Sequence, residues 1–157
     1  MKKVICVLLV VVVAVLGTAC SAFIKHIGDV NGEDTALCVI TENEIIRGSH
    51  VTVQIGSSQS NVSVGNGRKI SYKVAKLSGV ERIGSVRLSG EDATFTFNVS
   101  LTGGNARVVV VSGGKIVGEA KVNGESVVKI ENGKGSYDIK VAGESAKLDL
   151  SVVVTKS

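Results

Sequence analysis

The sequence predicts an all-β domain, an antiparallel β-sandwich, that follows an apolar N-terminal segment. Apolar residues are mostly valine and isoleucine, which pack well on a pleated sheet, while aromatic residues make up 3% and proline is absent. Several segments alternate between apolar and polar residues. Glycines also recur every 9 to 11 residues from Gly103 to Gly143. Short strands with regular turns are typical of a sandwich with Ig-like or jelly-roll-like architecture and Greek-key or meander connections.

The first 19 residues have the pattern of an export signal. Lys2 and Lys3 precede the uncharged stretch VICVLLVVVVAVL, residues 4–16, and the small residues Gly17, Thr18 and Ala19 follow it. A short positive start, an apolar stretch and small residues at its exit are typical of a secretory signal peptide. We therefore expect the rest of the chain to lie outside the cytoplasm.

Residues 16–20, LGTAC, resemble the lipobox of bacterial lipoproteins, which usually has Leu, two small residues and Cys. Thr18 and Ala19 fit this pattern, whereas Gly17 stands in the usual position of Leu and Leu16 lies one residue earlier. The resemblance implies that residues 1–19 are a signal peptide and that Cys20 is the lipid attachment site. It also implies a membrane as partner, with residues 20–35 as the lipidated cysteine and a polar tether.

Two other interpretations of the same segment stay open. Residues 4–24 are 21 uncharged residues, long enough to span a bilayer as an uncleaved anchor helix with Lys2 and Lys3 in the cytoplasm. Alternatively, a signal peptidase cleaves after Ala19 or Ala22 and the domain is secreted. A disulfide between Cys20 and Cys38 is compatible only with an unlipidated Cys20.

Residues 36–157 are expected to form a single β-sandwich domain. Ala93–Leu101, ATFTFNVSL, places Phe95, Phe97 and Val99 on one face and polar residues on the other. Val108–Val111 is apolar on both faces, which predicts a central strand covered on both sides. Further strands are expected at residues 36–40, 51–55, 61–64, 69–75, 82–88, 135–142 and 148–154. Lysines at positions 69, 115, 129, 140 and 147 are candidate guards of the sheet edges.

The stretch GKGSYDIKVAG resembles the closing hairpin of small Gram-positive surface lipoproteins of unassigned function. In those proteins a Gly-x-Tyr-x-Ile-x-Val strand precedes the final strand, and Gly135, Tyr137, Ile139 and Val141 match this pattern. The resemblance implies a β-sandwich and no activity.

The sequence nominates no catalytic, cofactor-binding or metal-binding residue. The only histidines are His26 and His50, and no HExxH, GxSxG, CxxC or phosphate-loop motif is present. We therefore predict that the chain is not an enzyme and takes no cofactor. The pair Glu91-Asp92 is interpreted as solvated loop charge.

Composition also bears on the partners. Nucleic acid is not expected as a partner, because the chain lacks a basic patch interleaved with exposed aromatic residues. The prediction is a membrane-anchored extracytoplasmic lipoprotein with a structural or protein-interaction role, with another envelope protein as a candidate partner. The alternative is a module that binds an envelope glycan or a small solute through polar loops such as Gly56–Ser60 or Gly65–Arg68.

Overall fold

The computed structural model describes residues 40–157. The signal segment, the proposed lipid attachment site Cys20, the tether, and residues 36–39 of an expected strand all lie outside the described residues. The described part contains one short helix and seven strands: α2 (Glu42–Arg47), β1 (His50–Ile55), β2 (Ser58–Val64), β3 (Gly67–Ser89), β4 (Ala93–Ser112), β5 (Lys115–Ala120), β6 (Gly124–Ile130) and β7 (Lys134–Lys156).

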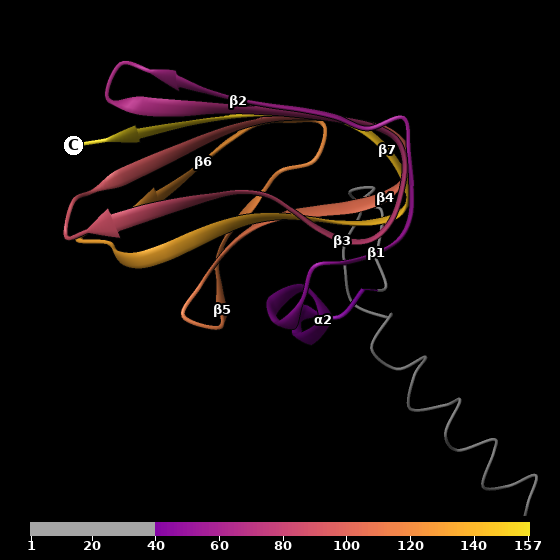
Figure 1. Ribbon diagram of the computed structural model, residues 1–157, viewed down its shortest axis with the longest axis horizontal. Helices are drawn as coiled ribbons and strands as arrows, with labels where there is room; N and C mark the ends of the chain where they lie inside the picture. The colour runs from indigo at the N-terminus through magenta and orange to yellow at the C-terminus, as the bar shows by residue number, and fades with distance from the viewer. Residues whose placement is uncertain (1–39) are drawn as a thin grey trace, which may run out of the picture. The chain divides into compact units, whose positions relative to one another are not determined.

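All strand pairs are antiparallel, which confirms the predicted all-β class. Strands β3, β4 and β7 are 20 to 23 residues long, and each bends in the middle so that its two halves lie in two stacked layers (Figure 1). The upper layer of Figure 1 has the order β2-β3-β7-β4-β6. The lower layer has the order β1-β3-β7-β4-β5, and the two layers form one continuous hydrogen-bonded sheet.

The continuity of these strands corrects the prediction that each half is a separate strand. Residues 69–75 and 82–88 are both part of β3, and the expected closing hairpin over residues 135–154 is the single strand β7. The pairing of β3 with β7 continues through the bends with local register shifts. Gly103 and Gly143 therefore lie at bends within strands, whereas Gly113 and Gly133 lie in connections between strands and Gly124 is the first residue of β6.

The bend of β4 requires a glycine at position 104. Gly104 has φ +68°, in the left-handed region that L-residues with a side chain rarely adopt. A Cβ atom at this position would lie well under 3.0 Å from the backbone oxygens of both Glu144 and Ser145 in the bend of β7. The two bends are thus nested in backbone contact, which leaves no space for a side chain.

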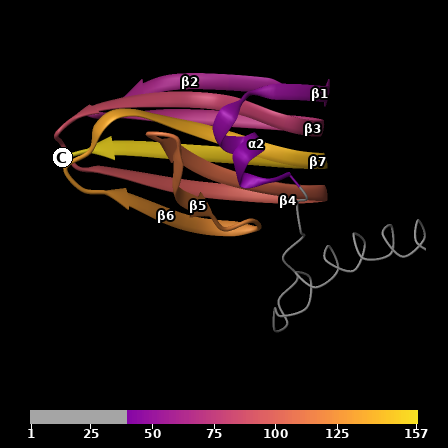
Figure 2. The same cartoon turned by 90° about the horizontal axis from the view of Figure 1, so that it is seen from below.

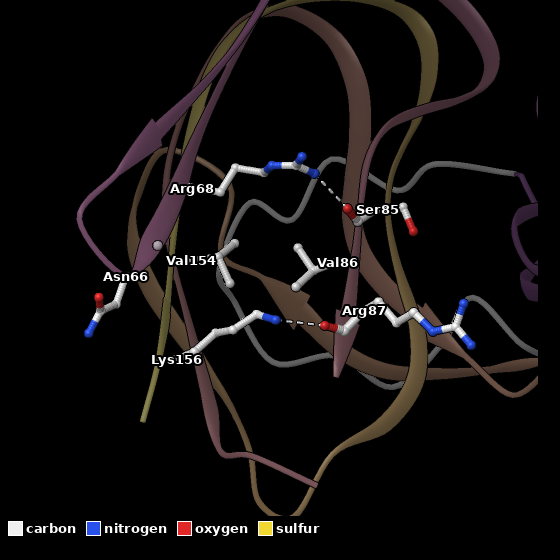
Figure 3. A pocket seen from close by; sticks show the side chains of 8 residues that line it. Asn66, Arg68, Ser85, Val86, Arg87, Val154 and Lys156 are labelled. Atoms are coloured by element: carbon white, nitrogen blue, oxygen red, sulfur yellow. Dashed lines mark hydrogen bonds between the residues drawn. The ribbon is translucent and has the colours of Figure 1, made fainter. Parts of the chain in front are cut away.

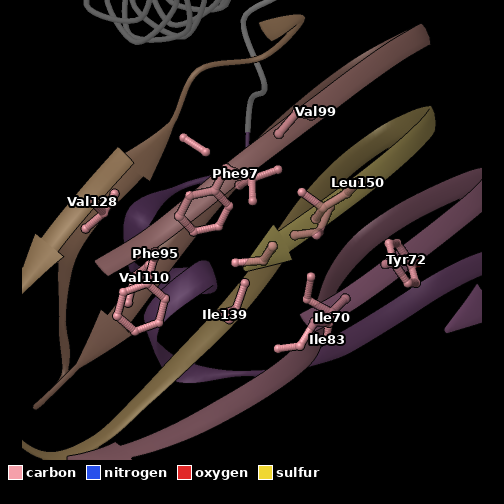
Figure 4. Packing of buried hydrophobic residues seen from close by; sticks show 14 of the residues in the cluster. Ile70, Tyr72, Ile83, Phe95, Phe97, Val99, Val110, Val128, Ile139 and Leu150 are labelled. Carbon is pink, nitrogen blue, oxygen red and sulfur yellow. The ribbon is translucent and has the colours of Figure 1, made fainter. Parts of the chain in front are cut away.

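The core fills the space between the two layers (Figure 4). Phe95 and Phe97 are fully buried, with ring centroids 6.5 Å apart, and the ring centroid of Tyr137 lies 6.4 Å from that of Phe95. The alternation predicted for Ala93–Leu101 is confirmed, since its apolar residues face this core. Burial of such aromatic and β-branched side chains is the main force that holds the layers together.

Helix α2 covers the outer face of the lower layer (Figure 2). It begins with a capping box in which Thr41 and Glu44 bond each other's backbone N–H groups, and it buries Ile45. Ile45 packs in a cluster with Val109 and Val111. Residues 108–111 are therefore covered on both faces, as predicted. The core between the layers covers Val108 and Val110, and the cluster under α2 covers Val109 and Val111.

Lys140 fastens this helix to the sheet. Its ammonium donates hydrogen bonds to the carbonyl oxygens of Ile45 at 2.8 Å, Ile46 at 3.0 Å and Gly48 at 3.1 Å, at the C-terminal end of α2. Burial lowers the pKa of Lys140. Lys140 is 6% exposed and lies on the central strand β7, so the expectation that it guards a sheet edge is wrong. The helix itself was not expected, because six residues are too few to show a helical repeat.

Candidate functional site

The second half of β3 has an edge that no strand covers. β2 pairs with residues 67–73 of β3, and β1 pairs with residues 76–80. From Arg82 to Ser89, β3 has β7 on one side and no strand of the described chain on the other. The carbonyl groups along this edge therefore need other hydrogen-bond partners.

Side chains from the upper layer supply these partners. The Gln59 amide donates to the carbonyl oxygen of Ile83, and the Arg68 guanidinium donates to that of Ser85 at 2.9 Å. The Lys156 ammonium donates to the carbonyl oxygen of Arg87 at 2.7 Å. These three donors come from β2, β3 and β7, so they bridge the two layers along the free edge of β3, and Arg68 and Lys156 do so at the end of the sandwich opposite the bends.

A cleft of about 400 Å³ opens between the layers at this place (Figure 3). Val86 and Val154 supply its apolar part, and Arg68 and Lys156 reach across it. The side chain of Arg87 points away from these two cations, so that residue contributes chiefly its backbone. The complete lining is Asn66, Gly67, Arg68, Ser85, Val86, Arg87, Val154 and Lys156. We name this site the open-end cleft.

The lining of the open-end cleft contains three cationic residues, Arg68, Arg87 and Lys156, and no acidic residue. One of these cations has an acidic partner beside the cleft. Lys156 forms an ion pair with Glu91, with 3.0 Å between Nζ and Oε1. The other carboxylate oxygen of Glu91 accepts a hydrogen bond from the backbone N–H of Ser89 at 2.6 Å. The hydrogen bond from Ser89 is the main reason that the pKa of Glu91 is lowered, with its own backbone N–H and then Lys156 contributing further.

Of the two cations that reach across the cleft, Arg68 has the larger unused hydrogen-bonding capacity. It forms no ion pair with an acidic residue in the part of the chain that the structure describes. A guanidinium carries five N–H donors, and the bond to Ser85 uses one of its nitrogens. The remaining donors have the planar geometry that suits a carboxylate or phosphate group.

A second polar cluster bridges the layers through Tyr72. The Tyr72 hydroxyl donates to the carboxylate of Glu81. The Gln54 amide donates to Glu81 at 2.7 Å and to the Tyr72 oxygen at 3.3 Å. Burial, followed by the hydrogen bond to Glu81, raises the pKa of Tyr72 far above its ordinary range. The hydroxyl therefore stays protonated and acts as a structural donor.

The open-end cleft includes part of one loop that the sequence nominated. Gly65–Arg68 spans the turn between β2 and β3, and Asn66, Gly67 and Arg68 line the cleft. The other nominated loop, Gly56–Ser60, does not join the cleft. Its residues 58–60 line a smaller hollow of about 210 Å³, and Gly56 lines a separate hollow of about 390 Å³.

Glu91 and Asp92 lie in the connection between β3 and β4 and are partly exposed and exposed, respectively, as their interpretation as solvated loop charges predicts, but they also have structural roles. Both carboxylates accept backbone hydrogen bonds, Glu91 from Ser89 and Asp92 from Asn132 at 2.8 Å. Lys156 was not among the residues nominated from the sequence. Its bond to Arg87 joins residues 69 positions apart, and such a contact leaves no local pattern.

Metal-binding clusters and membrane-spanning helices are both absent from residues 40–157. Within this range no cluster of three or more His, Cys, Asp or Glu side chains could hold a metal ion. No helix in the same range has the length and apolar character needed to cross a bilayer.

Comparisons with known proteins give a limited result. No protein-family model matches the chain, and no curated protein matches it. A solved structure of carbohydrate-binding module CBM36 in complex with calcium and xylotriose is similar with a TM-score of 0.31 and 18% identity, covering 73% of this chain and 97% of that chain.

The CBM36-1 domain of a multidomain xylanase from the hindgut metagenome of Trinervitermes trinervoides gives a TM-score of 0.30 and 19% identity. It covers 64% of this chain and 87% of that chain. Similarity at this level does not transfer a ligand or a binding site to this chain.

Proposed function

We propose that this chain is a non-catalytic binding module, held at the outer surface of a cell membrane by a lipid on Cys20, whose open-end cleft binds an anionic group. The observation that carries the binding role is Arg68, an exposed guanidinium without an acidic partner among the described residues, held beside Lys156 and two valines. The ligand class is a carboxylate or phosphate group on an envelope glycan or a small solute.

The geometry of the cleft supports this ligand class. Arg68 and Lys156 are both fastened to backbone carbonyls, at 2.9 Å and 2.7 Å, so an anion would meet donors that are already positioned. Preorganised donors increase affinity because less side-chain entropy is lost on binding. The aromatic residues within 40–157 are all buried, so in this range a sugar would be recognised by its charge and hydroxyl groups, without aromatic stacking. They are Tyr72, Phe95, Phe97 and Tyr137.

The test of the binding role is thermal unfolding of the chain with glucuronate or inorganic phosphate, and with glucose as the neutral control. A ligand at about 100 times its Kd stabilises the folded state by about 2.7 kcal/mol. We expect glucuronate or phosphate, but not glucose, to raise Tm by several degrees. Arg68→Gln should abolish the increase.

Lys69→Gln is the matched control for this test. Lys69 is the next residue on β3, it is exposed, and it does not line the cleft. This variant should keep the full response to the anions. An increase in Tm that survives Arg68→Gln, or no increase with either anion, would contradict the proposed binding role.

The anchoring role has a separate test, the intact mass of the mature chain from a bacterial host. Lipidation predicts a chain that begins at Cys20 and carries a lipid-sized mass increment, together with loss of membrane association in Cys20→Ala. An unmodified chain that begins at Met1 would point to an uncleaved helix. An unmodified chain that begins at Cys20 or Phe23 would point to secretion, and either result would refute the lipid anchor.

A further inference from the structure

Strand β2 is an unguarded edge of the upper layer. All seven of its residues, SQSNVSV, are exposed, and none of them carries a charge. Val62 and Val64 are 55% and 54% exposed. An uncharged edge strand with exposed β-branched side chains is a template for pairing with another strand.

The opposite edge of the same layer is protected. β6 carries Glu125 and Lys129, and in the lower layer the edge strand β5 carries Lys115 and Glu119. Charged side chains on edge strands disfavour pairing with other chains. Lys115 and Lys129 thus lie on edge strands, as expected for residues that disfavour pairing with other chains, whereas β2 has no charged residue.

The direction of the backbone groups of β2 follows from one hydrogen-bonded pair at the end of the sandwich. Asp92 and Ser157 exchange two backbone hydrogen bonds of 3.1 Å. Exchanging and non-exchanging pairs alternate along antiparallel strands, and no register shift interrupts the upper layer from this pair to β2. The alternation directs the N–H and C=O groups of Gln59, Asn61 and Ser63 to the open side of β2.

These outward groups are symmetric about Asn61. We propose that β2 pairs in antiparallel fashion with β2 of a second copy of this chain, around a two-fold axis at Asn61. Asn61 then lies opposite its own equivalent, Gln59 lies opposite Ser63, and each such pair exchanges two backbone hydrogen bonds. The upper layers of the two copies become one continuous sheet.

The side chains of β2 suit a second copy as the occupant. The pairing places Ser60 opposite Val62 on the outer face, and Ser58 opposite Val64, so each exposed valine meets a small uncharged residue. No like charges oppose each other, and the two-fold axis at Asn61 fixes the register between the two copies of β2. An isologous contact of this kind closes with two copies and does not propagate into a fibre.

The test uses cysteine pairs in the full chain, in a background where the three native cysteines are replaced by alanine. Residues opposite each other in a non-exchanging pair lie about 4.5 Å apart between Cα atoms, within the range of a disulfide. A mixture of Ser60→Cys and Val62→Cys chains should form an intermolecular disulfide under mild oxidation. A mixture of Ser60→Cys and Val64→Cys chains is the control for register and should form much less.

Sedimentation of the chain at increasing concentration tests the same contact without cysteines. Asn61→Pro removes an outward N–H and no bond within the sheet, so it should weaken self-association at least about tenfold while the far-ultraviolet circular dichroism is unchanged. Val127→Pro, on the opposite edge, should leave self-association intact. A monomer at every concentration, a preference for the Ser60–Val64 pair, or loss of association only in Val127→Pro would each overturn the proposal.

Discussion

The two ends of the sandwich join its layers by different means. At the bend end, the backbones of β3, β4 and β7 pass continuously from one layer to the other, and a Cβ atom on Gly104 would lie well under 3.0 Å from backbone oxygens of β7. At the open end the layers are joined by short connections and side chains. Gly90 donates to the carbonyl of Gly133 at 2.7 Å, and Arg68 and Lys156 reach from one layer to the other.

We expect the bend end to contribute mainly to stability and the open end to contribute mainly to binding. Where the bend of β4 meets the bend of β7, backbone packs against backbone, which leaves no space for a side chain at Gly104 and tolerates little change. A hollow of about 390 Å³ does lie beside the bends, on residues that include Val74, Ala75 and Thr102. Side chains that bridge a gap at the open end leave a cleft of about 400 Å³ and carry charge into it. The open end is distinguished by cationic side chains that reach across its cleft, and substitutions at the two ends should have different effects.

The largest effect is expected from Gly104→Ala. Both the positive φ of Gly104 and the short approach to Glu144 and Ser145 oppose a side chain, so we expect a loss of at least about 3 kcal/mol in the free energy of unfolding. Gly135→Ala, near the open end, is the matched control. Gly135 has φ +95°, but no atom lies within 4 Å of the position that a Cβ would take, so the loss should be about 1–2 kcal/mol.

Urea denaturation of both glycine variants distinguishes the two ends. Equal losses would show that the close backbone approach at the bends adds nothing to the cost of a positive φ.

A smaller effect is expected from Lys156→Gln and Arg68→Gln. Each change removes a hydrogen bond to a carbonyl on the free edge of β3, which costs about 1 kcal/mol. Arg87→Gln should be nearly neutral, because the Arg87 side chain points away from the cleft (Figure 3). The measurement is the midpoint of urea denaturation, and a loss in Arg87→Gln as large as in the other two variants would count against these bridges.

The smallest effect is a pH dependence that arises from Glu91. Its pKa is lowered in the folded state by the Ser89 hydrogen bond, its own backbone and Lys156, so its contribution to stability is present at neutral pH. That contribution is lost as the pH falls through the lowered pKa. Glu91→Gln should therefore reduce the loss of Tm below about pH 4.5. Glu44 lies near the start of the described chain, and hydrogen bonds from Thr41 lower its pKa as well. The Glu91→Gln variant should therefore keep the part of the acid sensitivity that comes from Glu44.

The strands could be predicted from the sequence because alternation is a local property. Residues 93–101 and 108–111 have the burial that their patterns predict. The joins between them could not be predicted, because a bend within a strand and a turn between strands use the same residues. Gly143 with Ser145 lies in a bend of β7, whereas Asn132 with Gly133 forms a connection, and both contain glycine and a residue with positive φ.

The candidate site was predictable only in part for a related reason. The loop Gly65–Arg68 was nominated by its polar residues, and Arg68 lines the cleft. Its partner is the backbone oxygen of Ser85, and Lys156 bonds the backbone oxygen of Arg87. A backbone carbonyl is the same at every position, so neither bond leaves a signal in residue identity.

The most direct test of binding at the open end is a nuclear magnetic resonance titration of the isotope-labelled chain with glucuronate and with phosphate, followed through the backbone amide signals. We predict saturable shifts for Arg68, Ser85 and Lys156 at the open end, unchanged signals for Gly104 and its neighbours at the bend end, and no response to glucose. Shifts confined to the bend end, or no saturable shift with either anion, would contradict an anion site in the open-end cleft.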